Sequence, residues 1–163
     1  MLNKFNYKLN YRLLNFRINS EVYRVGKGEQ GVMLVEPYKS EILPHWRFKT
    51  PDFSLHSSIA IKELFYKYKC QQDFVGMDMA RKFLQMGYTR ARRYANHSSG
   101  KKYDGPVPKE KLGQSGSHGR PTLPLDTDNE KAKSAKIFYE AWQEIEQDQM
   151  YVELKKGWKV LRG

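Results

Sequence analysis

Residues 74–95 read FVGMDMARKFLQMGYTRARRYA, a stretch without proline in which apolar side chains recur every three or four positions. This spacing predicts an amphipathic helix, and Asp73 just before it has the side chain of a helix N-cap. At 100° per residue, one face of the helix carries small residues, which allow another element to pack closely. These residues are Gly76, Ala80, Gly87, Ala91 and Ala95, with Leu84 among them.

The opposite side of the predicted helix is basic, and the positive charge continues just beyond its end. Phosphates attract cations and nucleobases stack on aromatic rings, so this run with its interleaved tyrosines predicts a nucleic-acid-binding face. The alternative is a solvated face on which Asp78 pairs with Arg81 or Lys82. The predicted nucleic-acid-binding residues are Arg81, Lys82, Arg90, Arg92, Arg93, Lys101, Lys102 and Tyr103.

Upstream of this helix, the sequence predicts a small antiparallel sheet. Residues 5–13 alternate between apolar and polar side chains, which is the period of a strand with one buried face. Two β-prone runs, 21–25 and 32–35, flank the glycine-rich segment GKGEQG at 26–31. Such an arrangement is typical of a β-hairpin.

Two more helices complete the predicted fold. Residues 54–69 carry apolar side chains at helical spacing, and so does the acidic segment that follows the linker. We therefore expect an α+β fold, in which the N-terminal strand and the hairpin form a small antiparallel sheet packed by about three helices. Residues 1–103 would form a basic core, 104–125 a Gly- and Pro-rich linker or extended loop, and 126–163 an acidic helix with a basic tail that packs on the core.

The chain of 163 residues has a formal charge of +11, and this charge is unevenly distributed. Residues 1–102 hold 19 Lys and Arg against 8 Asp and Glu, whereas the remaining residues hold 10 of each sign. Clustered positive charge raises the local concentration of anions. The asymmetry therefore favours a binding site for a polyanion over a basic surface that serves only solubility.

A second group of residues predicts a small-molecule pocket. The segment GKGEQG matches the G-x-G-x-x-G pattern of dinucleotide sites, but that pattern needs a following helix, and here a β-prone run follows. The segment is then either a glycine loop that covers phosphates or a hairpin turn that needs positive φ angles. The next loop mixes carboxylates suited to acid–base chemistry with cations suited to an anion, unless buried aromatics merely pin it. The predicted ligand-binding residues are Lys27, Glu36, Tyr38, Lys39, Glu41, His45, Arg47 and Lys49.

Other classes of site are not indicated by the sequence. Cys70 is the only cysteine, so no disulfide forms within the chain, which fits a reducing compartment. The four histidines lack ligand spacing, and we expect neither a metal nor a cofactor. No segment approaches the about 20 apolar residues of a membrane span, and no secretory signal is visible. We therefore expect a cytoplasmic protein without a membrane partner.

Four stretches of the chain resemble an uncharacterised family, catalogued as a domain of unknown function in bacteria, tailed bacteriophages and some fungi. They are YRVGKGEQGV at 23–32, EPYKSEILP at 36–44, WRFKTP at 46–51 and FVGMDMARKF at 74–83 with its continuation to Asn96. The resemblance covers residues 20–103 closely and the acidic helix more loosely. It implies a cytoplasmic protein of a bacterium, or of the infected cell if a phage encodes it, and it implies no reaction and no catalytic residue.

The leading functional prediction is binding of a phosphate-rich ligand, above all nucleic acid, DNA or RNA, through the basic helix face. Two alternatives stay open. The glycine hairpin and the 36–49 loop would bind a nucleotide-like anion, in a small enzyme or in a protein that sequesters nucleotides, for instance in phage counter-defence. The other alternative is an adaptor that docks on an acidic protein partner.

Overall fold

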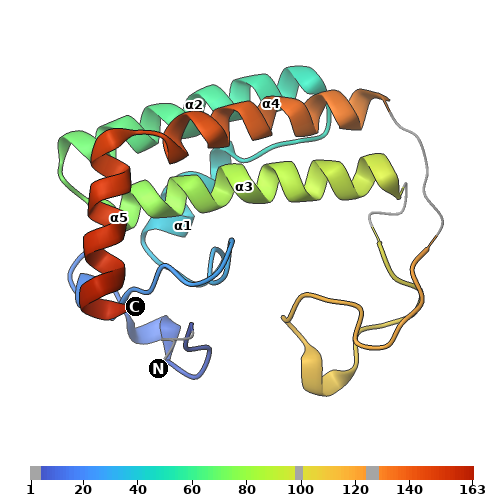
Figure 1. The fold of residues 1–163 in the computed structure, drawn as a ribbon, viewed down its shortest axis with the longest axis horizontal. Helices are drawn as coiled ribbons and strands as arrows, with labels where there is room; N and C mark the ends of the chain where they lie inside the picture. Colours follow the sequence, from blue (N-terminus) through green and yellow to red (C-terminus); the bar gives the residue numbers. More distant parts are fainter. Residues whose placement is uncertain (1–4, 98–100, 124–128) are drawn as a thin grey trace.

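The computed structural model describes residues 5–97, 101–123 and 129–163, and within these residues the fold is all-helical (Figure 1). The described residues contain no sheet, and their only β pairing is an isolated antiparallel bridge between Tyr103 and Thr122. The expected α+β class, with its N-terminal strand and hairpin, is therefore wrong. The helices are α1 (Tyr38–Ile42), α2 (Pro51–Cys70), α3 (Phe74–Asn96), α4 (Asn129–Glu146) and α5 (Gln149–Arg162), with short 3-10 helices at Tyr11–Leu13, Ser20–Val22, Leu43–His45 and Lys109–Lys111.

The predicted boundaries of the two central helices are confirmed to within a few residues. Asp73 caps α3, because its Oδ1 accepts a hydrogen bond of 3.1 Å from the backbone N–H of Gly76. Helix α2 begins three residues earlier than expected, because Thr50 caps it through the N–H of Phe53 and Pro51 fits its first turn. The acidic segment and the basic tail form two helices, since Asp148 caps a new helix, α5, through the N–H of Tyr151.

Helices α2, α3 and α4 run alongside one another, and α5 crosses the end of this bundle at which α3 begins (Figure 1). The small residues of α3 lie at its closest contacts. A side-chain carbon at Gly87 would lie 2.5 Å from the Phe138 ring of α4, and Gly76 lies equally tightly against the Tyr68 ring of α2. Only glycine permits these rings to lie directly on the α3 backbone.

The N-terminal segment covers the bundle as irregular chain, although its sequence alternates like a strand. Its apolar anchors, among them Phe16, Tyr23 and Val25, are buried against the helices. Alternate positions are not consistently buried, because Tyr7 is 49% and Leu13 is 80% exposed. Tertiary packing has thus overridden a local strand pattern.

The glycine-rich segment forms a curled loop and not a hairpin. Three successive backbone hydrogen bonds join residues three positions apart, from the N–H of Gln30, Val32 and Leu34 to the carbonyls of Lys27, Glu29 and Gly31. Gly26, Gly28 and Gly31 all have positive φ angles, as the hairpin interpretation required of its glycines. The consecutive turns use the backbone groups that a second strand would have needed. We call residues 26–31 the glycine loop.

No helix among the described ranges has the length and apolar character that crossing a membrane requires.

Substituting Gly87 tests the close contact between α3 and α4. Gly87→Ala should lower the free energy of unfolding by about 1–3 kcal/mol, because overpacking against Phe138 outweighs the gain in helix propensity of about 1 kcal/mol. The matched control is Gly157→Ala in α5, where a side-chain carbon meets nothing within 4 Å. That variant should be stabilised by up to about 1 kcal/mol. Urea unfolding of both variants checks this, and equal effects would contradict the packing described here.

Candidate functional site

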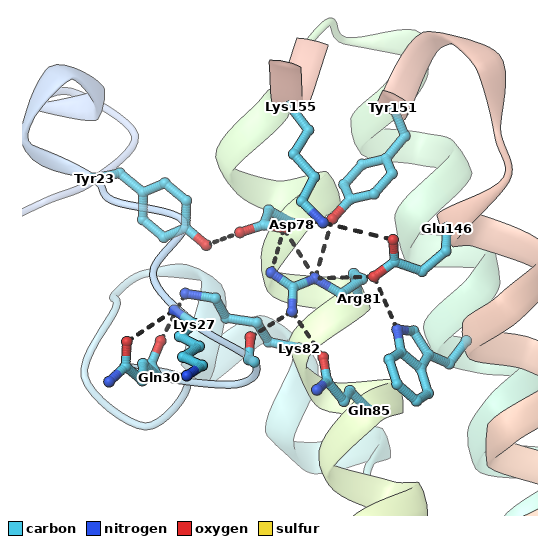
Figure 2. A network of polar contacts seen from close by, with 12 residues as sticks. Tyr23, Lys27, Gln30, Asp78, Arg81, Lys82, Gln85, Glu146, Tyr151 and Lys155 are labelled. Carbon is cyan, nitrogen blue, oxygen red and sulfur yellow. Dashed lines mark hydrogen bonds and ion pairs between the residues drawn. The ribbon is translucent and has the colours of Figure 1, made fainter. Parts of the chain in front are cut away.

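A buried polar network joins the N-terminal segment, α3 and α5 (Figure 2). At its centre is Asp78, whose side chain is fully buried. Its carboxylate accepts hydrogen bonds from the hydroxyl groups of Tyr23 and Tyr151, the latter at 2.7 Å. The Arg81 guanidinium, one turn further along α3, forms an ion pair with it at 2.7 Å. Burial alone would raise the pKa of Asp78, but the charges of Arg81 and Lys82 outweigh burial and hold it at about 2.

The two buried cations of this network hold the glycine loop. Arg81 donates to the carbonyl of Gly28, and Lys82 donates to the carbonyl of Gln30 at 2.6 Å. The Lys82 ammonium also lies 4.8 Å from the centre of the Tyr23 ring. Burial lowers the pKa of Lys82 to about 7, although Asp78 opposes this shift. These contacts fix the loop backbone across α3.

The buried positions of Arg81 and Lys82 change the interpretation of the basic helix face. Their exposed fractions are 3% and 0%, so neither presents its charge to solvent. The pairing of Asp78 with Arg81 that the alternative interpretation expected is present, but the solvated face on which it placed this pair is not, because both side chains are buried. The first half of the basic run is therefore part of the interior, and only its second half is a surface.

The second half of the run occupies the last turns of α3 and the chain beyond it. Arg90 is exposed, whereas Arg92 and Arg93 are half-buried. None of these three arginines forms an ion pair with a residue in the described ranges. Lys101 and Lys102 are exposed in the 101–123 segment, where the half-buried Tyr103 lies beneath the cations of Lys102 and Arg120.

The carboxylates of the second predicted group are engaged in structural contacts. Glu36 accepts hydrogen bonds from the N–H and hydroxyl groups of Ser40, and Glu41 binds the Arg17 guanidinium through two hydrogen bonds of 2.7 and 2.8 Å. The bond from Arg17 lowers the pKa of Glu41, so the pair stays ionised. Tyr38 is buried, and its hydroxyl group donates to the α3 cap, Asp73. These contacts tie α1 to its neighbours.

The remaining members of that group are cations or lie at the surface. Lys27 is exposed on the glycine loop, Lys39 is half-buried on α1, and His45 is exposed. Arg47 and Lys49, also exposed, differ from the rest because both line a groove.

This groove has a volume of about 390 Å³ and is formed by the 47–49 loop and by residues of α2, α3 and α4. Three cationic and three aromatic side chains line it. They are Arg47, Lys49 and Lys131, and Phe48, Phe53 and Tyr94. We call this set the aromatic–basic groove.

Tertiary contacts hold the aromatic–basic groove in shape. The Lys131 ammonium donates to the carbonyls of Phe48 and Lys49, the latter at 2.6 Å, which ties the loop to α4. It also lies 5.7 Å from the centres of both the Phe48 and Tyr94 rings. On the other side, the N–H of Arg47 donates to the buried hydroxyl group of Ser57 in α2. The loop is therefore fixed before any ligand binds.

Four lining residues of the groove were absent from the predicted binding residues, namely Phe48, Phe53, Tyr94 and Lys131. Neither Phe53 nor Lys131 belongs to a sequence pattern that indicates a site. The contact between Lys131 and Phe48 joins residues 83 positions apart, so no local pattern indicates it. Tyr94 belongs to the interleaved tyrosines of the basic run, but it was not among the predicted binding residues. Arg90 lies one turn before Tyr94, so the two share a face of α3 and connect the basic surface with the groove.

The chain belongs to the DUF4385 family, a domain of unknown function. The family model matches residues 6–160, which includes every helix but the last two residues of α5. The resemblance stated from the sequence motifs is thereby confirmed. Comparison with curated proteins and with solved structures gave no match.

Removing one hydroxyl group tests the buried network of this DUF4385 domain. Tyr151→Phe should lower the free energy of unfolding by about 1–3 kcal/mol, because Asp78 and Arg81 each lose a buried hydrogen-bond partner. Tyr139→Phe is the matched control, since this tyrosine is 44% exposed. Its effect should stay within about 0.5 kcal/mol in the same denaturant titration. A Tyr151→Phe variant as stable as the control would contradict a stabilising role of the network.

The pH dependence of stability tests the ion pairing of Asp78. Its folded-state pKa of about 2 lies below the ordinary value of 3.8, so the pairing contributes its full stability above that ordinary value. The contribution should be lost as the pH falls from about 4 to about 2, and it amounts to about 2 kcal/mol. Denaturant unfolding across this range measures it. Unchanged stability down to the lower limit would show that Asp78 is not held ionised by its partners.

Proposed function

We propose that this protein binds single-stranded nucleic acid, with bases in the aromatic–basic groove and phosphates on the basic end of α3. The observation that carries the proposal is the presence of three cations and three aromatic rings in the lining of one groove. Proteins that bind single strands without strong sequence preference combine the same two elements, a basic track for the backbone and rings for the bases.

The aromatic rings favour a single strand over a duplex. A base can stack on Phe53 or Tyr94 only if its face is free, and in a duplex both faces are covered by neighbouring bases. Phe53 is 46% exposed at the surface of α2. A base stacked on its ring would bury apolar area that is now in contact with water. Arg47 and Lys49 then lie within the same groove to neutralise the adjacent phosphates.

A free nucleotide is the second candidate ligand, and the size of the groove favours it. A volume of about 390 Å³ lies within the range of small-molecule pockets, about 300–1,000 Å³. A nucleotide would use the same rings and cations but would not extend to the basic end of α3. The two ligands therefore differ in whether affinity grows with the length of the strand.

Variants of the groove should weaken oligonucleotide binding in two distinguishable ways. Phe53→Ala should reduce affinity for a labelled single strand by about 5- to 100-fold, because one stacking contact is lost. Arg47→Gln should reduce affinity. It should also make the slope of log affinity against log salt less steep by about one, which corresponds to the loss of one phosphate contact. Fluorescence anisotropy at several salt concentrations measures both effects.

Matched controls are available on α2 itself. Leu55→Ala removes an apolar side chain that is 47% exposed but does not line the groove. Lys67→Gln removes a charge in the last turn of α2, about 20 Å along the helix from Phe53. Absence of binding at low salt, or equal losses in variants and controls, would overturn the proposal. Full competition by a mononucleotide, with no dependence on strand length, would favour the second candidate.

A further inference from the structure

The glycine loop places a carboxylate against the basic end of α3. The Glu29 side chain is partly buried, and its two oxygens lie 3.0 and 3.3 Å from the hydroxyl oxygen of Thr89. Within the described parts of the chain, this hydroxyl group is its only hydrogen-bonding partner, and no cation lies within 4 Å of it. A carboxylate that loses water without gaining an ion pair is held in an unfavourable environment.

The charges around Glu29 show what kind of group this position suits. Burial raises the pKa of Glu29, whereas the hydrogen bond from Thr89 and the positive charges of Arg90 and Arg93 lower it. Arg93 lies four residues after Thr89 and three residues after Arg90 on α3, so it neighbours both of them on the helix surface. The site therefore attracts an anion, but the carboxylate does not reach the guanidinium groups.

We propose that Thr89, Arg90 and Arg93 form a phosphate subsite, and that the Glu29 carboxylate occupies it as an internal stand-in until a ligand phosphate displaces it. The inference rests on the proposed function for the source of that phosphate, a nucleic acid backbone. Arginine guanidinium groups bind phosphate oxygens through paired hydrogen bonds, which a carboxylate on a short tether does not satisfy here. A phosphate at this subsite neutralises two arginines that have no ion-pair partner in the described chain.

The loop geometry allows the exchange without unfolding. Arg81 and Lys82 hold the carbonyls of Gly28 and Gln30, the two residues that flank Glu29. The loop backbone thus stays in place while the Glu29 side chain turns outward. The subsite and the aromatic–basic groove also share helix α3, on which Arg90 lies one turn before the groove residue Tyr94. A strand bound at the subsite can place its next base in the groove.

The decisive variant is Glu29→Gln, which keeps the size of the side chain and removes its charge. It should raise affinity for a labelled single-stranded oligonucleotide by roughly three- to tenfold, because the ligand no longer competes with an internal anion. Glu21→Gln is the matched control, since Glu21 is exposed and its substitution changes the net charge by the same amount. The gain should disappear in the double variant Glu29→Gln with Arg93→Gln, because the two residues act on one subsite.

A second measurement tests the subsite without relying on nucleic acid. Inorganic phosphate titrated into Glu29→Gln should shift the backbone amide NMR signals of Thr89, Arg90 and Arg93 at lower concentration than in the wild type. An equal gain in oligonucleotide affinity for Glu29→Gln and Glu21→Gln, or a gain that persists without Arg93, would overturn the subsite. So would unchanged amide signals at these residues under phosphate. If phosphate binds there but oligonucleotides do not bind the wild type, the proposed function fails and the subsite stands.

Discussion

The ion pair between Asp78 and Arg81 lies where three segments distant in sequence meet. Tyr23 of the N-terminal segment and Tyr151 of α5 both donate a hydrogen bond from the hydroxyl group to the Asp78 carboxylate. Since an unpaired charge in the interior costs several kcal/mol, each partner is needed to keep the others in place. Packing alone would tolerate small shifts of α5 and the N-terminal segment, whereas a shared buried carboxylate specifies one arrangement.

This network divides the basic run of α3 into two parts with different roles. Arg81 and Lys82 are withdrawn from the surface, but they fix the glycine loop, and the loop determines which groups face the end of the helix. These two cations therefore contribute no charge to the surface, and they hold the backbone of the glycine loop in place instead. Arg90 and Arg93 keep their charge at the surface, close to a loop whose position the buried cations determine.

The central helices could be predicted because their signals are local. The Asp73 cap, the apolar period and the small residues that receive Tyr68 and Phe138 all lie within one continuous stretch. The N-terminal segment was mispredicted because its alternation is a property of the sequence, while its burial depends on contacts with α3 and α5. The groove depends on the Phe48 and Lys131 contact, for which no local pattern exists. Exposure of charge was equally invisible, since Arg81 and Arg93 look alike in sequence.

The ion pairs of the described residues show how the basic end of α3 differs from the surface of α4. Along α4, exposed lysines and glutamates pair with each other, as Lys133 does with Glu130 and Lys136 with Glu140. Such exposed pairs add little stability, but their opposite charges largely cancel the local electrostatic potential on that helix. The described arginines at the end of α3 have no such partners among the described residues. The Glu29 carboxylate, which interacts with the charges of Arg90 and Arg93, is hydrogen-bonded to the hydroxyl group of Thr89 and not to them. Positive charge without an ion-pair partner among the described residues therefore lies on the same helix that contributes Tyr94 to the aromatic–basic groove.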